Sequence, residues 1–300
     1  MGGSLRNPAS FCNVVGYRPS IGRQPNGKGF GWYGRLSTTG PMAKTVSDVA
    51  YLMSIIGGPD KFDPLTLPEN PKQFAELLKL PIDMSKVRVA YCPDLHGLPI
   101  DTEVRRIISG AAKTFERLGS VVVETTPDLS RAMEVFHIQR AAGLALLGNS
   151  LQATVPNWRV YTKKTAIWNI EKGQALSAND IIQTELLRNQ IYTHAVNFME
   201  DYDVIILPAA QVPAFDINTE WVNEIDGQTM ETYIDWMTVC CAITITGFPA
   251  ISVPAGFTKD GLPVGVQIVG RPRGDFDLLR IAHAYELATE HYRNTPKILN

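Results

Sequence analysis

The apolar positions between residues 87 and 123 change period twice. Residues 87–91, Val-Arg-Val-Ala-Tyr, are typical of a short strand, and Asp101 then caps a helix whose apolar residues recur every three or four positions. Gly119 ends this helix, and three valines at 121–123 predict a second strand. A strand, a helix and a strand in this order predict a parallel pair within a sheet that helices cover. The apolar helix positions are Val104, Ile107, Ile108, Ala111, Ala112, Phe115 and Leu118.

The same two periods continue toward the C-terminus. Residues 130–201 have a mostly helical pattern that is interrupted around Pro156, and residues 264–269 form an uninterrupted apolar run typical of a buried strand. Asp275 then begins a helix that places Leu278, Ile281, Ala282 and Tyr285 on one face. No internal repeat interrupts the alternation, so the chain is predicted to have an α/β fold.

Residues 236–257 contain no charged side chain and are long enough to span a bilayer. Gly247, Pro249, Pro254 and Gly256 interrupt the segment, and threonines at 238, 244 and 246 add polarity. We therefore predict a buried helix, a turn and a buried strand instead of a membrane span. The chain also lacks a secretory signal, and Arg6 breaks the myristoylation pattern, which favours a cytoplasmic protein without a membrane partner.

Composition narrows the function classes. The 300 residues are 45% hydrophobic and carry a net charge of −2, which supports a packed core and gives no basic field for nucleic acid. The four cysteines form no C-x-x-C pair, so we expect reduced thiols and no metal site, with the first of them buried. They are Cys12, Cys92, Cys240 and Cys241.

The first six residues, Met-Gly-Gly-Ser-Leu-Arg, carry the candidate chemistry. Consecutive glycines let the backbone adopt a positive φ and bring its N–H groups close to a substrate. Acyl transfer needs such donors beside a nucleophile, because an oxyanion forms when the carbonyl is attacked. Ser4 is therefore a candidate nucleophile.

Several ordered motifs resemble the amidase signature family of serine hydrolases. Residues 2–25 read GGSLRNPASFCNVVGYRPSIGRQP, residues 40–45 read GPMAKT, and residues 203–208, 246–256 and 262–271 fit later blocks of the family pattern. The resemblance implies a mixed β-sheet core flanked by helices, and one partial domain over residues 1–300 with the nucleophile loop at 1–6. It also implies hydrolysis of a small carboxylic amide without a cofactor.

The same resemblance implies roles for individual residues. Ser4 would be the acyl-enzyme nucleophile, the backbone N–H groups of Met1, Gly2 and Gly3 would form the oxyanion hole, and Arg6 would orient the loop by pairing with acidic side chains. The family's base is a lysine that works through a second serine, and both lie before the GGS motif. We therefore expect this chain alone to be inactive, to expose apolar surface, and to associate with itself or with a missing N-terminal segment.

No residue within the chain offers a replacement base. The five histidines have no catalytic motif context, and Lys44 is better explained by a structural ion pair. The alternative to an amidase is a non-catalytic remnant, or a complementing or binding subunit with the same fold. The tRNA-dependent amidotransferase of the family is less favoured, because residues 16–25 differ from its usual continuation. The histidines are His96, His137, His194, His283 and His291.

Residues 29–34 contain two further patterns. Gly29-x-Gly31-x-x-Gly34 matches a dinucleotide fingerprint, but no strand precedes it and no helix follows, so we discount a nucleotide site. Phe30, Trp32 and Tyr33 either line a substrate pocket or pack within a loop.

Overall fold

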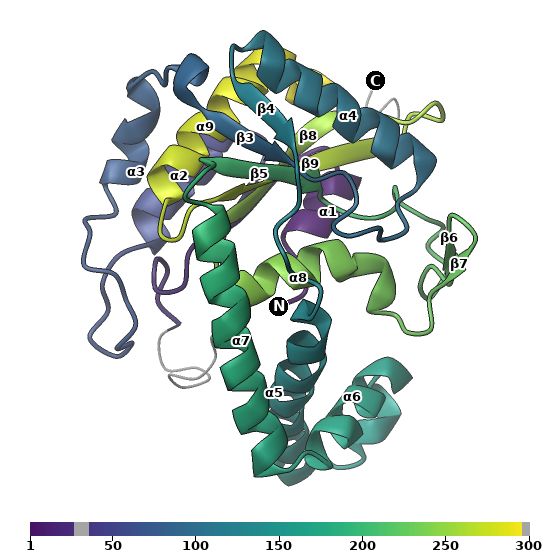
Figure 1. Ribbon diagram of the computed structural model, residues 1–300. Helices are drawn as coiled ribbons and strands as arrows, with labels where there is room; N and C mark the ends of the chain where they lie inside the picture. Colours follow the sequence, from purple (N-terminus) through teal and green to yellow (C-terminus); the bar gives the residue numbers. More distant parts are fainter. Residues whose placement is uncertain (27–35, 296–300) are drawn as a thin grey trace.

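A computed structural model of the chain describes residues 1–26 and 36–295 and contains a mixed seven-stranded sheet (Figure 1). Four neighbouring pairs, from β2 through β1, β8 and β9 to β5, are antiparallel, whereas β5, β3 and β4 are parallel. The predicted α/β fold with a mixed sheet is therefore confirmed. The strands, in spatial order, are β2 (Met42–Ala43), β1 (Val15–Arg18), β8 (Ala250–Phe257), β9 (Pro263–Gly270), β5 (Val204–Pro208), β3 (Arg88–Tyr91) and β4 (Val121–Glu124).

The predicted strand-helix-strand unit lies at one edge of the sheet. Strands β3 and β4 pair in parallel with Arg88 opposite Val121, and α4 (Thr102–Arg117) connects them. The Asp101 carboxylate accepts hydrogen bonds from the backbone nitrogens of Glu103, at 2.8 Å, and Val104, at 3.2 Å. This cap satisfies two N–H groups that the first helical turn cannot pair internally, which confirms the predicted start of the helix.

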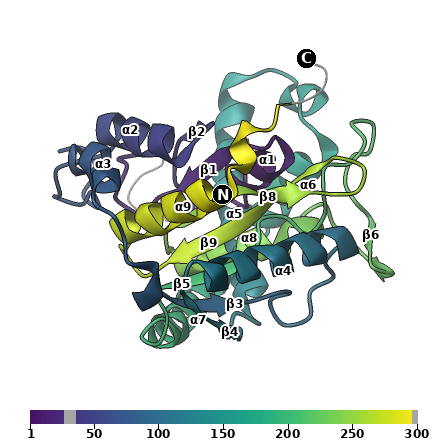
Figure 2. The same cartoon turned by 90° about the horizontal axis from the view of Figure 1, so that it is seen from above.

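Helices cover both faces of the sheet (Figure 2). Helices α2 (Val46–Ile56), α4 and α9 (Asp275–Thr289) pack on one face, and α5 (Ala132–Thr154), α7 (Ala178–Phe198) and α8 (Thr238–Thr246) pack on the other. Successive side chains of β5 point to opposite faces of the sheet, so this strand contributes to a hydrophobic core on each face. Val204 and Ile206 enter the first core, whereas Ile205 and Leu207 enter the second.

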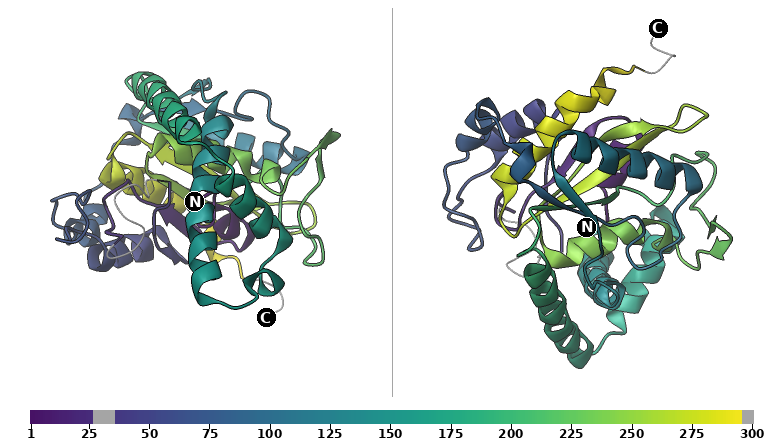
Figure 3. Two further views of the ribbon diagram at one scale, coloured as in Figure 1. Left: turned by 90° about the horizontal axis from the view of Figure 1, so that it is seen from below. Right: turned by 45° about the horizontal axis from the view of Figure 1, so that its top comes forward.

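Helices α5, α6 (Lys164–Gln174) and α7 extend beyond the sheet as an arm (Figures 1 and 3). The predicted interruption of the helical region is confirmed, because α5 ends before Pro156 and a 3₁₀ turn, η3 (Trp158–Tyr161), follows. Shorter elements complete the described chain. They are α3 (Gln73–Glu76), η1 (Leu77–Lys79), η2 (Met84–Lys86), β6 (Glu224–Ile225), β7 (Gln228–Thr229), η4 (Asp235–Met237) and η5 (His291–Arg293).

The uncharged segment 236–257 folds as the sequence predicts. Helix α8 is buried along its length, Gly247 turns the chain at φ 72°, and β8 follows as a buried strand. In the part of the chain that the structure describes, no helix is long and apolar enough to cross a membrane.

Glu103, in the first turn of α4, binds the turn between β8 and β9. Its carboxylate accepts two hydrogen bonds from Arg106, at 3.1 and 2.9 Å, and one from the Lys259 backbone nitrogen at 3.0 Å. These bonds, that from Arg106 first, lower the pKa of Glu103 from 4.5 to about 2. Because the folded pKa lies below the unfolded one, the stabilisation is complete above pH 4.5 and is lost as the pH falls toward 2.

We therefore expect Glu103→Gln to lower the Tm at neutral pH, and this deficit to shrink as the pH is lowered toward about 3. Thermal unfolding of both proteins across this pH range measures the effect. A deficit that stays constant with pH would contradict the assigned pKa.

Candidate active site

The predicted nucleophile loop, residues 1–6, enters α1 (Arg6–Phe11) at its last residue and lies against α8. Three successive carbonyl groups of the loop accept hydrogen bonds from the protein interior, which fixes the orientation of its peptide planes. The donors are Thr244 Oγ1 to the Met1 oxygen at 3.0 Å, Cys241 Sγ to the Gly2 oxygen at 3.5 Å, and the Asn7 nitrogen to the Gly3 oxygen at 2.8 Å.

The Met1 and Gly2 carbonyls, which accept from α8, direct the N–H groups of Gly2 and Gly3 away from α8, and the Gly3 carbonyl, which accepts from α1, directs the Ser4 N–H group away from the α1 axis. The described peptide bonds are all trans, and in a trans peptide the N–H group points opposite to the carbonyl oxygen. The N–H groups of Gly2, Gly3 and Ser4 donate to no acceptor within residues 1–26 and 36–295. They are therefore available to an oxyanion beside the exposed Ser4 side chain.

Both glycines of the loop are required by close packing. Gly3 has a φ of 115°, and an added Cβ there would lie 2.9 Å from the Cβ of Cys240. A Cβ on Gly2 would lie 2.8 Å from the Phe136 ring. The loop can approach α8 this closely only without side chains at these two positions.

Arg6 fastens α1 to β9 and α8. Its side chain is 1% exposed and donates to the Gln267 side-chain oxygen, to Thr244 Oγ1 at 2.7 Å and to the Cys240 carbonyl at 3.2 Å. The loop-orienting position predicted for Arg6 is thus present, but the predicted acidic partners are wrong. The acceptors within the described residues are neutral, because β9 and α8 offer an amide, a hydroxyl and a carbonyl at this depth.

The region around the loop carries an excess of buried positive charge. Arg18, on β1, is 3% exposed and donates to the carbonyls of Phe248 and Leu36, both at 3.4 Å. Burial, and then the charges of Arg6 and Arg188, lower the pKa of Arg18 to about 9.

Within the described residues, the exposed Ser4 hydroxyl forms no hydrogen bond to a general base. Each of the five histidines is at least partly exposed, as predicted. Lys44 is exposed next to β2 and forms no ion pair with the described residues, so the predicted structural ion pair is wrong. A surface position after a two-residue edge strand brings no carboxylate within reach of this lysine.

The cysteines are free thiols, as predicted, but the expected burial of Cys12 is wrong. Cys12 follows the last residue of α1 and is exposed, because the buried face of this helix is formed by residues 6, 7, 9 and 10. Cys92, Cys240 and Cys241 are buried, and burial raises the pKa of each thiol. Among the residues that the structure describes, no group of histidine, cysteine or acidic side chains could hold a metal ion.

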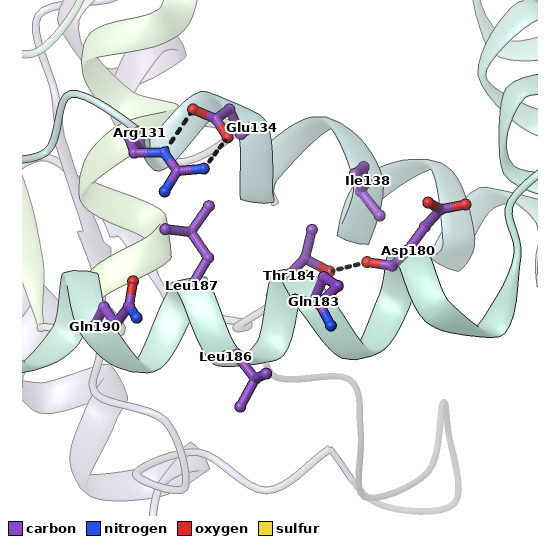
Figure 4. A pocket seen from close by; sticks show the side chains of 9 residues that line it. All are labelled: Arg131, Glu134, Ile138, Asp180, Gln183, Thr184, Leu186, Leu187 and Gln190. Atoms are coloured by element: carbon purple, nitrogen blue, oxygen red, sulfur yellow. Dashed lines mark hydrogen bonds and ion pairs between the residues drawn. The ribbon is translucent and has the colours of Figure 1, made fainter.

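Two other regions do not add to this site. Phe30, Trp32 and Tyr33 lie outside the described residues. A groove between α5 and α7, bordered by Arg131, Glu134 and Asp180, lies on the arm and includes no residue of the nucleophile loop (Figure 4).

Sequence patterns did not indicate the residues that hold the loop from beneath. Thr244 comes from α8 and Gln267 from β9, and both are buried. The available signal was a polar residue inside an apolar run, as at Gln267 within 264–269. A buried polar side chain of this kind requires a hydrogen-bonding partner, although the sequence does not show which one.

The comparisons with known proteins agree with the mixed sheet and the order of the motifs. Residues 1–279 match the family model described as Amidase, so the chain belongs to the amidase family. It is 31% identical over 292 residues to an acylamidase of Rhodococcus erythropolis, covering 95% of this chain and 59% of that protein.

Two further relatives extend this result. The chain is 31% identical over 316 residues to a glutamyl-tRNA(Gln) amidotransferase subunit of Thermodesulfovibrio yellowstonii, covering 98% of this chain and 64% of that protein. A solved bacterial aryl acylamidase of the amidase signature family has a TM-score of 0.86 at 25% identity, covering 97% of this chain and 62% of its own. The chain thus spans less than two thirds of the length of each relative.

Proposed function

We propose that residues 1–300 form the nucleophile-bearing part of a serine hydrolase that cleaves small carboxylic amides. The observation that carries this proposal is the exposed Ser4 hydroxyl beside three backbone N–H groups that the described residues leave unused. Ser4 Oγ forms a bond to the carbonyl carbon, and the N–H groups of Gly2, Gly3 and Ser4 stabilise the oxyanion. The sequence-based expectation named the N–H groups of Met1, Gly2 and Gly3, and this proposal keeps those of Gly2 and Gly3 but replaces that of Met1 by that of Ser4.

The proposed reaction also requires transfer of the Ser4 hydroxyl proton to the leaving amine. A base takes the proton of Ser4 as the ester bond forms, and returns it to the amine as the carbon–nitrogen bond breaks. Water then hydrolyses the acyl-enzyme and restores Ser4. We propose that the base, a lysine acting through a second serine, comes from polypeptide outside these 300 residues, since the described residues place none beside Ser4.

The buried arginines assist the oxyanion in this proposal. Arg6 and Arg18 do not contact the reacting atoms directly in the proposed mechanism, but the positive charges of these two buried side chains lower the cost of negative charge at the loop. The neutral acceptors of Arg6 leave its charge uncompensated within the described residues, which strengthens this effect.

The expected result is that the 300-residue chain does not turn over simple aryl and aliphatic amides, whereas a longer chain that adds the lysine and second serine does. In that active form, Ser4→Ala is expected to lower kcat on the order of 10⁴-fold or more, with an unchanged Tm because the side chain is exposed. Release of amine and thermal unfolding measure the two effects. Turnover that survives Ser4→Ala would exclude Ser4 as the nucleophile.

The second candidate is a non-catalytic complementing or binding subunit of the same fold. The absence of a base beside Ser4 within the described residues favours it over an enzyme that acts alone. Mixing the chain with a separately expressed segment that carries the lysine and second serine separates the two. Restored turnover supports the hydrolase, and complex formation without turnover supports the non-catalytic role.

A further inference from the structure

Three aromatic rings pack together at the far end of the helix that follows Ser4. Phe11, the last residue of α1, stacks on Trp236 at a centroid distance of 6.0 Å and meets Phe215 edge to face at 6.0 Å. Phe215 and Trp236 also meet edge to face, at 5.4 Å. We call these three residues the aromatic cluster.

Ser4 lies two residues before α1, and the bond from the Asn7 nitrogen to the Gly3 oxygen at 2.8 Å extends the helical turn back over Ser4. Phe11 follows Ser4 by seven residues, which in helical geometry corresponds to two turns and roughly 10 Å, so we infer that the two residues share one side of the helix. Ser4 is exposed and Phe11 is half-buried, whereas Arg6, Asn7 and Ala9 turn inward. Helical side chains lean toward the N-terminus of their helix, so the Phe11 ring leans toward Ser4.

The rings of the aromatic cluster pack against a small hydrophobic core on one side and are accessible to solvent on the other. Phe215 and Trp236 pack against a small core of Val212, Ile225 and Met230, and each of the two rings remains partly exposed. Trp236 lies in η4, which runs directly into α8, the helix that anchors the loop carbonyls (Figure 1). Two of the three rings therefore belong to α1 and to the turn directly before α8, the two helices that contact the nucleophile loop.

We propose that the aromatic cluster is a substrate subsite that binds an aromatic ring carried by the amide. This inference rests on the proposed function in that it places the amide carbonyl at Ser4. A ring attached to that carbonyl, or to the amide nitrogen, lies within the span between Ser4 and Phe11. Ring edges and faces presented by the cluster favour an aromatic ring over a saturated ring of similar size, because aromatic pairs gain from complementary quadrupoles.

The test measures ligand binding to the 300-residue chain carrying Ser4→Ala, so that no turnover is needed. Benzamide places the ring on the acyl side, acetanilide places it on the amine side, and cyclohexanecarboxamide is the saturated control. Ligand-observed NMR titrations give the three Kd values. We expect benzamide or acetanilide to bind about 2- to 10-fold more tightly than the saturated amide. Which of the two binds more tightly identifies the side of the amide that carries the ring.

Phe11→Leu is expected to remove this preference, and Phe215→Leu provides a second test if the first variant does not fold. Phe257→Leu is the matched control, because Phe257 is also partly buried and in ring contact, with His291 at 6.4 Å, but lies outside the cluster. Equal Kd values for aromatic and saturated amides, no measurable binding, or a preference that persists in both cluster variants would overturn the inference. Failure of the longer chain, with the lysine and second serine, to hydrolyse amides while the ring preference holds would instead refute the proposed function alone.

Discussion

Gly16→Ala is expected to destabilise the protein by about 3 kcal/mol, because β1 and α1 are in contact at this position without a side chain between them. An added Cβ on Gly16 would lie 2.1 Å from the carbonyl oxygen of Leu5 and 2.7 Å from the Cβ of Ala9. The first of these neighbours is backbone, so the whole helix must shift. Since Leu5 follows Ser4 directly, this shift also displaces the nucleophile.

Gly110→Ala is the matched control for this prediction. Gly110 is an exposed residue of α4, and an added Cβ there meets nothing within 4 Å. Alanine should stabilise this helix by about 0.5–1 kcal/mol, because it loses less conformational freedom on folding than glycine. Chemical denaturation gives both free energies of unfolding. Similar values for the two variants would show that the contact between α1 and β1 adapts.

Arg6→Met is expected to cost about 3 kcal/mol of unfolding free energy. The substitution keeps much of the side-chain volume but removes charged hydrogen bonds to Gln267 and Thr244, and it leaves the Gln267 oxygen buried without this donor. Removing the positive charge relieves its repulsion of Arg18, which offsets part of the loss. The nucleophile loop should also become more susceptible to proteolysis, because Thr244 and α1 hold it in place.

Arg131→Met is the matched control for Arg6→Met, because Arg131 also donates hydrogen bonds but is not buried. Arg131 donates two short hydrogen bonds to Glu134, at 2.9 and 2.7 Å, but its side chain is 58% exposed. Its loss should change the free energy of unfolding much less than Arg6→Met does, because solvent screens an exposed ion pair. If denaturation shows equal losses for both variants, the stabilisation by Arg6 does not depend on its burial.

Local patterns were sufficient wherever a single element decides its own structure. The capping carboxylate of Asp101 and the apolar period that follows it predicted α4, and the interruptions at Gly247 and Pro249 separated α8 from β8. The GGS motif likewise indicated the nucleophile loop, because only glycine permits the φ of 115° at Gly3 and the close approach at Gly2.

The partners of these elements could not be predicted from the sequence. Arg6 lies 261 residues from Gln267 and 238 residues from Thr244 in the sequence. A motif around Arg6 therefore cannot show that its hydrogen-bond acceptors are neutral groups and not carboxylates. The exposure of Cys12 and the isolation of Lys44 among the described residues depend in the same way on which helix face and which strand edge meet another element. The sequence by itself determined the family, the secondary structure and the candidate nucleophile, because these depend on short-range sterics, periodicity and motif order. Tertiary structure decided which N–H groups point outward, where positive charge is buried and which rings pack against Phe11, because these depend on contacts between distant segments.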